Sequence, residues 1–530
     1  MTGPARSVCV HYLGRSWTHE EVERQSSAFA QYLRAHGVQR GDRILLQLQN
    51  MPQALVACQA AWRLGAVVVP ANPMYKAAEL SHLITDCRPK AAVVLDNLYD
   101  STLRPLGDQL DGVTVVSTSP GDFADPAVAA ELGLEPVPVP GVPDFAGIVA
   151  ASVAGDMFDR EALPPTDIAA LVYTSGTTGP PKGAVITHGN LTVETAVWDE
   201  AYGLRPGDTI MGVAPFFHIT GLVADLVFAL ARKIPIVYMH RFDPHWALRW
   251  IELYRPTVMV AAITVYTALL RQPGLTAERV SSLRACLSGG APVSSATVRW
   301  WQDVTGGYLR NCYGLTETSS LATIAPAGSR APEDQATGAL SVGKAVGDTT
   351  ITIHDADDQA APANEVGEIV IGGGQVAAGY WGKPAETAET FRAGGLRTGD
   401  VGFLDEDGWL YVIDRRKDLI VTSGYKVWPR EVEDLLLRHP AVLEASVVGA
   451  ADAYRGERVV AYVALRPGED SQEADLISFC RDRVAVYKAP REVHVVRELP
   501  KSPAGKILRR ELREAHRRAT ENPVTAKPGP

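Results

Sequence analysis

The sequence lacks a long hydrophobic run. Its most apolar long stretch, GVPDFAGIVAASVAGDMF, is interrupted by Asp144 and Asp156. A membrane-spanning helix needs about 20 predominantly apolar residues, so no transmembrane segment is expected. The first residues, MTGPARSVCVHYLGRSW, contain neither an apolar core nor a small-residue cleavage site, which predicts that the chain carries no secretory signal.

The sequence also lacks a basic excess and any grouping of cysteines. Its formal net charge is −10, which argues against a general nucleic-acid or membrane-surface binder because such proteins carry a basic face. Disulfide and zinc frameworks need clustered spacing, and no CxxC pair occurs, so we expect reduced thiols in a cytoplasmic protein. The six cysteines are dispersed: Cys9, Cys58, Cys87, Cys286, Cys312 and Cys480.

The first third of the 530 residues alternates helical and strand patterns. Residues 19–38 are amphipathic with a helical period, residues 43–49 are an apolar strand pattern, and residues 52–65 are again helical. The same alternation continues through residues 66–96 and returns at residue 168. This rhythm predicts an α/β fold with largely parallel sheets covered by helices.

Later segments indicate further units. Residues 117–165 are rich in Pro and Asp and predict connecting loops, whereas residues 340–412 predict a small β-rich subdomain. The charged run DRRKD precedes a mixed α/β unit near the lower usual domain size. We therefore expect a large N-terminal domain over 1–414, a smaller C-terminal domain over 415–518 and a disordered tail over 519–530.

Residues 173–183 read YTSGTTGPPKG and form the most distinctive loop. Backbone N–H groups, hydroxyls and one lysine can surround phosphate oxygens, and glycines let the main chain approach closely. The loop is not a Walker-type P-loop, which needs Ser or Thr after Gly-Lys, because Lys182 follows Pro181 and precedes Gly183. A Gly-rich surface turn is the alternative interpretation of this loop taken alone.

The loop resembles the signature of the adenylate-forming enzymes, which comprise acyl-CoA synthetases, peptide-synthetase adenylation domains and firefly luciferases. Further motifs of that superfamily follow in its order: SGGAPVS at 288–294, YGLTET at 313–318, RTGD at 397–400, DRRKD at 414–418 and PKSPAGKILRR at 500–510. Taken singly, each motif residue has an ordinary interpretation as core, turn or surface charge. Their shared order makes coincidence implausible.

The resemblance implies a nucleotide site. In the superfamily the tyrosine of YGLTET stacks on adenine, the threonine meets the α-phosphate, the aspartate of RTGD accepts the ribose hydroxyls, and the glutamate of YGLTET holds Mg²⁺. The implied ATP- and AMP-binding residues are Thr174, Ser175, Gly176, Thr177, Thr178, Gly179, Lys182, Gly289, Gly290, Ala291, Pro292, Tyr313, Gly314, Thr316, Asp400 and Arg415, with Glu317 as the metal ligand.

The resemblance also implies two half-reactions with ATP, Mg²⁺ and CoA. A carboxylate attacks the α-phosphorus of ATP, aided by Lys506 and by the catalytic residues Thr174, Glu317 and His218, and positioning and charge neutralisation supply the catalysis. The C-terminal domain then rotates about a hinge at Lys417 and presents another face to a thiol. The implied CoA-binding residues are Gly424, Tyr425 and Lys426.

The implied acyl pocket contains His218, Ile219, Gly221, Ala262 and Ile263. Amino-acid-activating relatives usually carry Asp at the place of His218, so the sequence favours a non-amino carboxylic acid. Two departures concern acyl specificity. Ala262-Ile263-Thr264 replaces a Val-Pro-Thr segment, and Asn311-Cys312 replaces a Gln-Gly pair. Small residues in these segments suggest a bulky or long hydrophobic acid, although small residues also pack helices.

The sequence thus predicts an ATP-dependent acid–CoA ligase. A stand-alone ligase that loads a carrier protein or another nucleophile is the main alternative, and a luciferase-like oxygenase cannot be told apart from one sequence. A non-catalytic adenylate-binding protein is disfavoured because Lys506 and Glu317 are both present. Monomer and homodimer both remain open.

Overall fold

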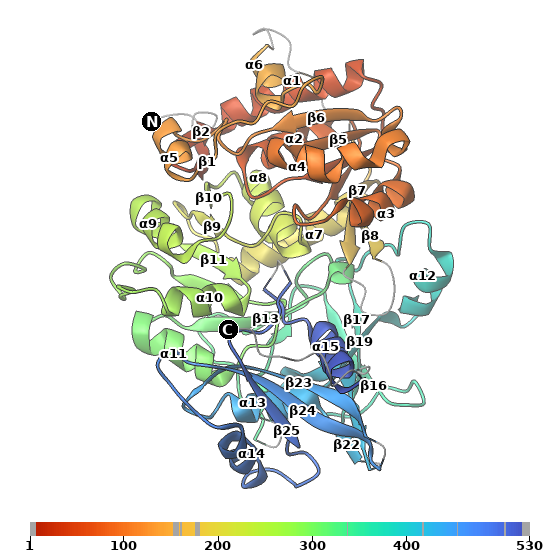
Figure 1. The fold of residues 1–530 in the computed structure, drawn as a ribbon. Coiled ribbons are helices and arrows are strands. Elements are labelled where there is room, and N and C mark those ends of the chain that lie inside the picture. Colours follow the sequence, from red (N-terminus) through yellow and green to blue (C-terminus); the bar gives the residue numbers. More distant parts are fainter. Residues whose placement is uncertain are drawn as a thin grey trace.

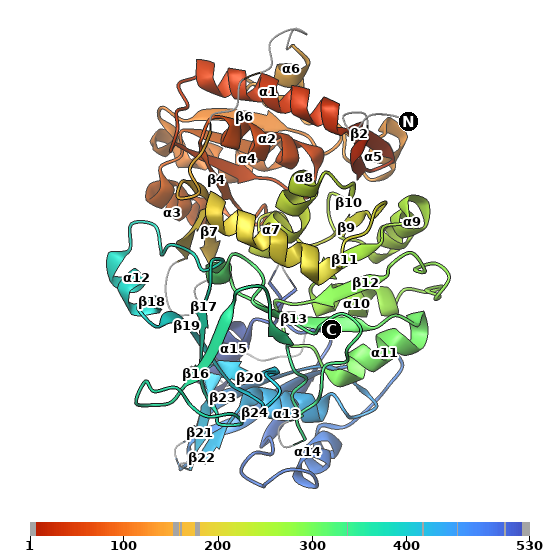
Figure 2. The same cartoon turned by 180° about the vertical axis from the view of Figure 1, so that it is seen from behind.

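The protein has a large N-terminal part and a smaller C-terminal part that lies against one end of it (Figure 1). The structure is a computed structural model that describes residues 7–151, 158, 162–174, 181–335, 338–415, 418–423, 425–452, 454–502 and 505–521. In both opposite views the first third of the chain lies at one end and the C-terminal part at the other (Figures 1 and 2). The middle of the chain lies between them, so it is the region that both ends can reach.

The first sheet is the α/β layer predicted from the first third of the chain. Its strand order, within the described residues, is β6-β5-β3-β4-β7-β8, and all pairs are parallel except β7–β8. Successive residues such as Leu45 and Leu46 belong to cores on opposite faces, as the two-residue period of a strand requires. The strands are β3 (Arg43–Gln47), β4 (Val67–Pro70), β5 (Ala91–Leu95), β6 (Thr114–Thr118), β7 (Ile168–Thr174) and β8 (Lys182–Thr187). The accompanying helices are α1 (His19–Ala35), α2 (Pro52–Arg63), α3 (Ala77–Cys87), α4 (Asp96–Thr102), the 3₁₀ segment η2 (Arg104–Leu110), α5 (Pro126–Glu131) and α6 (Phe145–Ala150).

The second sheet is the central one. In the described part of the chain its order is β15-β14-β13-β12-β11-β9-β10-β1-β2, with a parallel middle and antiparallel ends. Its strands are β1 (Val8–Tyr12), β2 (Arg15–Thr18), β9 (Ile210–Gly212), β10 (Ile236–Tyr238), β11 (Val258–Ala261), β12 (Ala285–Ser288), β13 (Leu309–Tyr313), β14 (Thr323–Ile324) and β15 (Lys344–Ala345). The helical segments are α7 (His188–Tyr202), the π-helix η3 (Gly221–Val227), α8 (Phe228–Arg232), α9 (Pro244–Tyr254), α10 (Ile263–Leu270), α11 (Ser295–Thr305) and the 3₁₀ turn η4 (Thr316–Thr318).

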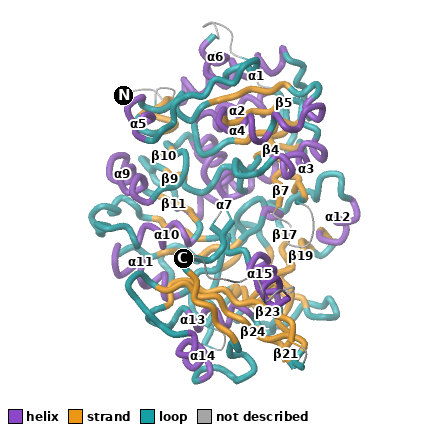
Figure 3. The backbone as a smooth tube through the Cα atoms, viewed as in Figure 1, coloured by secondary structure: helices purple, strands orange, loops and turns teal. Residues whose placement is uncertain are grey.

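The third sheet is the predicted small β-rich subdomain, whose strands can be followed in Figure 3. All of its strand pairs are antiparallel. Its core contains Ile353, Ile369 and Leu396, which are buried against the central sheet's Ala322. Its elements are β16 (Thr350–His354), β17 (Gly367–Gly372), α12 (Pro384–Thr390), β18 (Phe391–Arg392), β19 (Gly395–Leu404) and β20 (Leu410–Arg415).

The C-terminal part is the predicted mixed α/β unit. Adjacent residues of β23 enter different cores: Val447 packs with the α13 and α14 side, and Val448 packs with Leu512 of α15. The elements are β21 (Ile420–Thr422), β22 (Tyr425–Val427), α13 (Pro429–Leu436), β23 (Val442–Asp452), β24 (Gly456–Leu465), α14 (Glu473–Arg481), β25 (Glu492–Val496) and α15 (Arg509–Glu521). No helix among the described residues has both the length and the apolar character needed to cross a membrane.

Two local expectations differ from the structure. Residues 117–165 contain the short helices α5 and α6 as well as loops, because the side chains of Asp125 and Asp144 accept hydrogen bonds from the first-turn N–H groups. The expected tail over 519–530 begins too early, since α15 continues to Glu521. Residues 509–521 contain no Gly or Pro, and the first position that disfavours helix is Asn522, which precedes Pro523. The sequence therefore does not end the helix at residue 518.

Candidate active site

The ends of the phosphate-loop segment are held by a hairpin. Thr174 at the end of β7 pairs with Lys182 at the start of β8, so the chain leaves and re-enters the sheet at one place. The predicted phosphate-binding residues Ser175, Gly176, Thr177, Thr178 and Gly179 lie outside the described residues. The described flanks therefore fix where the loop begins and ends.

Tyr380 connects the loop's lysine to the predicted metal ligand. The Lys182 Nζ lies 5.0 Å from the centre of the Tyr380 ring, a distance suited to a cation–π contact. The Tyr380 hydroxyl donates a 2.6 Å hydrogen bond to Glu317 Oε1. Partial burial, followed by the nearby negative charge of Glu317, raises the pKa of Tyr380, so its hydroxyl remains a donor at neutral pH. Sequence reasoning missed Tyr380, which lies in a segment without a distinctive pattern.

The predicted adenosine residues converge at the carboxyl ends of β12 and β13. The Tyr313 hydroxyl donates a 2.7 Å hydrogen bond to Asp400 Oδ2, joining the central sheet to the β-rich subdomain. Asp400 is 4% exposed and lies opposite Arg415 in the β19–β20 ladder. The structure therefore brings YGLTET and RTGD together, as the resemblance implies.

Two positions in this region require glycine, one because of close backbone approach and one because of its backbone conformation. A Cβ at Gly314 would collide with the Ser320 carbonyl oxygen, and Gly290 has φ +76°, in the left-handed region. Ala291 and Thr316 are part-buried, and Pro292 is exposed. At Gly289 a Cβ would lie 2.7 Å from Cys312 Sγ. Cys312, which stands where the superfamily commonly has glycine, therefore packs against this turn.

Lys506 reaches the N-terminal part through a tight turn. The Gly505 N–H donates to the Ser502 carbonyl at 2.8 Å, and the Lys506 N–H donates to Ser502 Oγ at 3.1 Å. Gly505 has φ +78°, and a Cβ there would collide with Thr264 Oγ1 and lie 3.5 Å from the Ala262 Cβ. The turn is thus seated against the segment before and within α10.

His218 lies within the electrostatic range of Lys506. Burial, followed by the positive charge of Lys506, lowers the pKa of His218 to about 4, so the imidazole is neutral at neutral pH. The two predicted catalytic residues come from different parts of the chain and meet only in the folded protein. Their meeting was not predictable from spacing, although both residues were.

The remaining predicted acyl residues lie at the starts of two helical segments, η3 and α10. Ile219 is 2% exposed, while Ala262 and Ile263 are part-buried at the N-terminus of α10. A Cβ at Gly221 would collide with the backbone of Pro215, so this glycine is explained by close packing of η3 rather than by room for a ligand. Gly221 therefore does not support the inference, drawn from small residues, that the substrate is a large acid.

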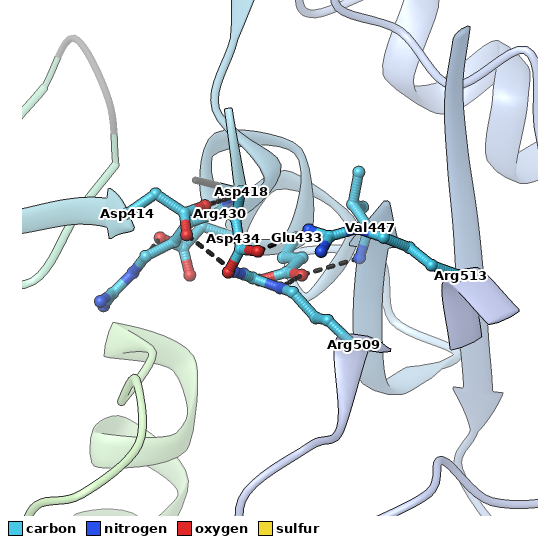
Figure 4. Close-up of polar contacts among 8 residues, drawn as sticks. All are labelled: Asp414, Asp418, Arg430, Glu433, Asp434, Val447, Arg509 and Arg513. Atoms are coloured by element: carbon cyan, nitrogen blue, oxygen red, sulfur yellow. Dashed lines mark hydrogen bonds and ion pairs between the residues drawn. The ribbon is translucent and has the colours of Figure 1, made fainter. Parts of the chain in front are cut away.

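The predicted hinge is flanked by a buried charged cluster that sequence reasoning missed (Figure 4). Arg509 of α15 contacts Asp414 Oδ1 at 2.7 Å, Asp418 Oδ2 at 3.3 Å and Glu433 Oε2 at 2.6 Å. Three carboxylates raise the pKa of Arg509 well above its usual value, and burial raises the pKa of Glu433, an effect that Arg509 opposes. Lys417 itself lies outside the described residues. The available signal was Arg509 in the KILRR motif.

Of the predicted CoA residues, Tyr425 is described in full and lies on the edge of the C-terminal sheet. Tyr425 is on the edge strand β22, is 56% exposed and stacks on Tyr487 with 4.5 Å between ring centres. Figure 1 shows β22 at the far end of the C-terminal part. Lys426 has a described backbone in β22, and Gly424 lies outside the described residues.

The chain belongs to the AMP-binding enzyme family. This family matches residues 2–381, and the AMP-binding enzyme C-terminal domain matches residues 431–506. The sequence is 34% identical over 525 residues to a long-chain-fatty-acid–CoA ligase of Bacillus subtilis (strain 168), covering 97% of this chain and 92% of that protein.

Solved structures of the same fold agree. The ATP-bound crystal structure of MatB from Rhodopseudomonas palustris has a TM-score of 0.86, 29% identity and coverage of 97% of both chains. The anthranilate CoA ligase AuaEII in complex with anthranoyl-AMP has a TM-score of 0.87 and 26% identity, covering 98% of this chain and 95% of that one. The predicted superfamily and the α/β fold with a smaller C-terminal domain are confirmed.

Proposed function

We propose that this member of the AMP-binding enzyme family is an ATP-dependent carboxylic acid–CoA ligase that acts through an acyl-adenylate. The observation that carries this proposal is the seating of the Lys506 turn against Ala262 and Thr264, beside His218. An ammonium delivered from a separate part of the chain suits a step in which negative charge moves over phosphoryl oxygens. Relatives that join carboxylic acids to CoA support the same activity.

In the first half-reaction the acid's carboxylate oxygen attacks the α-phosphorus and pyrophosphate leaves. We assign the β- and γ-phosphates to the loop between Thr174 and Lys182, and the ribose to Asp400. Lys506 bridges the attacking carboxylate and the phosphate. His218 lines the path of the acid, and because its imidazole is neutral it does not compete with Lys506 for an ion pair with the carboxylate. Thr174 and Lys182 belong to the first sheet and Asp400 to the third, whereas Lys506 comes from the C-terminal part, so this half-reaction needs the C-terminal part in the described position.

Glu317 fits Mg²⁺ as a single carboxylate ligand. Among the described residues, one group of three His, Cys, Asp or Glu side chains has its ligand atoms close enough together to hold a metal ion: Glu492, His494 and His516. Glu317 is not a member of that group. A lone carboxylate suits Mg²⁺, which is usually bound by one or two carboxylates together with substrate phosphates. The Tyr380 hydroxyl holds Glu317 in place, and the bound ion would neutralise phosphate charge.

In the second half-reaction the CoA thiol replaces AMP on the acyl carbon. We propose that the C-terminal domain, residues 415–518, rotates about Lys417 relative to domain 1–414, removing Lys506 and presenting Gly424, Tyr425 and Lys426. The exposed position of Tyr425 on the edge strand β22 supports a second working face. An acyl carrier protein in place of CoA is the alternative, which a CoA-independent accumulation of adenylate would favour.

We propose a hydrophobic, non-amino acid as the substrate. Phe217 and His218 supply no carboxylate to pair with a substrate ammonium, and the relatives include a ligase named for a long-chain fatty acid. We also propose a cytoplasmic location, since all six cysteines are buried and free.

The decisive experiment measures pyrophosphate release from ATP across short, long-chain, aryl and polycyclic acids, with and without CoA. Release that requires one acid class and accelerates with CoA is expected. Lys506→Ala should abolish adenylation and largely spare thiolysis of supplied acyl-adenylate. Equal loss of both steps would contradict the two-face assignment, and acid-independent release would contradict the ligase.

A further inference from the structure

Asp225 is an anomalous residue of the central core. It lies on the π-helix η3, is 0% exposed, and neither carboxylate oxygen has a hydrogen-bond partner among the described residues. The Ala214 backbone N–H faces the carboxylate and favours its charged form, but without full hydrogen-bond geometry. A buried polar group without a partner costs about 1–3 kcal/mol, so such a residue usually serves a ligand or ordered water.

Two tyrosine hydroxyls face the same region and also have no partner in the described structure. Tyr202 of α7 and Tyr238 of β10 are each 1% exposed, and the Asp225 charge contributes to raising the pKa of both. The Tyr202 ring lies 5.4 Å from that of Phe228, three residues after Asp225. The Tyr238 ring covers Gly212, where a Cβ would lie 2.5 Å from it. The two hydroxyls, from a helix and a strand, thus lie buried within electrostatic range of the Asp225 carboxyl group on the π-helix.

Asp225 lies farther along the helical segment that begins just after His218. The helical segment follows His218 directly, and the Leu222 N–H donates to the His218 carbonyl at 2.9 Å. Asp225 is seven residues farther on, or roughly 10 Å at the helical rise per residue. π-helical turns inside helices are often found at functional sites. The position therefore suits the distal end of a bound acid whose carboxylate is at Lys506.

We propose that Asp225, Tyr202 and Tyr238 form a polar subsite that hydrogen-bonds an oxygen function at the distal end of the acid. The inference rests on the proposed ligase function and narrows its substrate class. The acid is an otherwise hydrophobic carboxylic acid with a hydroxyl or oxo group about 10 Å from its carboxylate, as the helical rise indicates.

A neutral oxygen suits this subsite better than an ammonium. Burial raises the pKa of Asp225 well above its usual value, so the side chain is a neutral carboxylic acid that can donate. Together with two phenol hydroxyls, it offers donors that a hydroxyl or carbonyl oxygen accepts. An ammonium would need the charged carboxylate, which the apolar surroundings disfavour.

The test compares matched acids by kcat/KM for pyrophosphate release. The pairs are octanoic with 8-hydroxyoctanoic acid, and 3-phenylpropanoic with 3-(4-hydroxyphenyl)propanoic acid, with 8-aminooctanoic acid as the ammonium arm. The variants are Asp225→Leu, Asp225→Asn and Tyr238→Phe. The matched control is Tyr266→Phe, because Tyr266 is equally buried but its hydroxyl already donates to the Met259 and Leu287 carbonyls.

At least one hydroxylated acid should be preferred by about 10-fold to 100-fold over its partner, the discrimination expected for one or two buried hydrogen bonds. Asp225→Leu should reduce that ratio to about 1, Tyr238→Phe should reduce it partly, and Tyr266→Phe should leave it unchanged. Asp225→Asn, which keeps hydrogen-bonding atoms, tests whether loss of folding rather than loss of contact explains the leucine variant.

The outcomes separate the subsite from the ligase. If pyrophosphate release depends on the acid but Asp225→Leu changes the preference for the hydroxylated acid no more than Tyr266→Phe does, the subsite is overturned and the ligase is retained. Buried water would then be the partner of Asp225. A preference for 8-aminooctanoic acid overturns the neutral-oxygen assignment. Absence of acid-dependent release with every acid overturns the proposed function and the subsite together.

Discussion

Replacing Gly505 with alanine should slow adenylate formation far more than it slows thiolysis. In the described conformation Gly505 has φ +78°, and the added methyl group would collide with Thr264 Oγ1. The Lys506 turn would then have to withdraw from α10 or push Thr264 aside. Either movement displaces the ammonium from the acid and the phosphate.

The expected magnitude follows from separating two costs. A left-handed conformation costs a non-glycine residue about 1–2 kcal/mol, but this cost belongs to the turn itself and is shared by both half-reactions. Overpacking against Thr264 adds about 1–3 kcal/mol and arises only when the turn is seated. Adenylation should therefore fall about 5-fold to 150-fold relative to thiolysis, at roughly 1.4 kcal/mol per tenfold.

The assay measures single-turnover pyrophosphate release and, separately, CoA-dependent consumption of supplied acyl-adenylate. Gly468→Ala is the matched control, because Gly468 has φ +82° in the same domain with nothing within 4 Å of a Cβ. It carries the conformational cost without the contact, so the ratio of the two half-reactions should not change.

A second substitution makes the test sharper. Thr264→Ala in the Gly505→Ala background removes the colliding oxygen and should recover part of the lost adenylation. If both half-reactions fall equally, or if Thr264→Ala restores nothing, the contact between the turn and α10 does not govern adenylation and the reasoning is refuted.

Three further predictions concern the nucleotide and acid sites. Asp400→Ala should raise the KM for ATP at least about tenfold, whereas Tyr313→Phe, which keeps the ring and the carboxylate, should raise it by about threefold or less, measured by steady-state kinetics. Tyr380→Phe should raise the Mg²⁺ concentration needed for half-maximal activity severalfold, because Glu317 loses its 2.6 Å hydrogen bond; an unchanged Mg²⁺ titration would contradict the role of Glu317. His218 binds a proton more weakly in the folded protein, where its pKa is about 4, than in the unfolded chain, where it is about 6.5. The folded protein therefore loses stability as the pH falls from 6.5 to 4. A His218→Gln variant should therefore lose less thermal stability than the wild type between pH 6.5 and 4, and parallel curves would disprove it.

The sequence predicted the parts of the site that sit at strand ends in short motifs. Asp400 and Tyr313 are 87 positions apart, and their order within the superfamily motifs implied a shared site, in line with the hydrogen bond between their side chains; their role in nucleotide binding stays a prediction. Motif resemblance also identified Lys506 without any knowledge of its contact with α10. These residues were predictable because each motif fixes a backbone turn as well as a side chain.

Contacts between side chains from unrelated segments were not predictable. Tyr380 touches Glu317 only because the β-rich subdomain packs against the central sheet, and its own segment carries no pattern. Gly221 illustrates the opposite error: a small residue that could signal ligand space is needed for the approach of η3 to the Pro215 backbone. Composition cannot distinguish these two uses of glycine, since both need the same missing side chain.

The charged cluster beside the proposed hinge bears on the proposed domain movement. Asp414 precedes Lys417 and would stay with the N-terminal domain, whereas Arg509 and Glu433 would rotate with the C-terminal one. The Asp414 side chain is 2% exposed and accepts from Arg509 at 2.7 Å and from the Arg430 N–H at 2.9 Å. Losing one partner of a buried ion pair typically costs about 3–5 kcal/mol.

Surface contacts between the two domains contribute much less. The Arg438–Glu333 pair spans the interface at 2.9 Å, but its side chains are 49% and 26% exposed, and such pairs are usually worth about 0–1 kcal/mol. The free-energy difference between the two proposed conformations therefore depends on what Asp414 contacts after rotation, since burial makes its loss of Arg509 costly. If the C-terminal domain rotates about Lys417, the second conformation must return a partner or solvent to that carboxylate, and we propose that Asp414 in this way couples domain position to the chemistry.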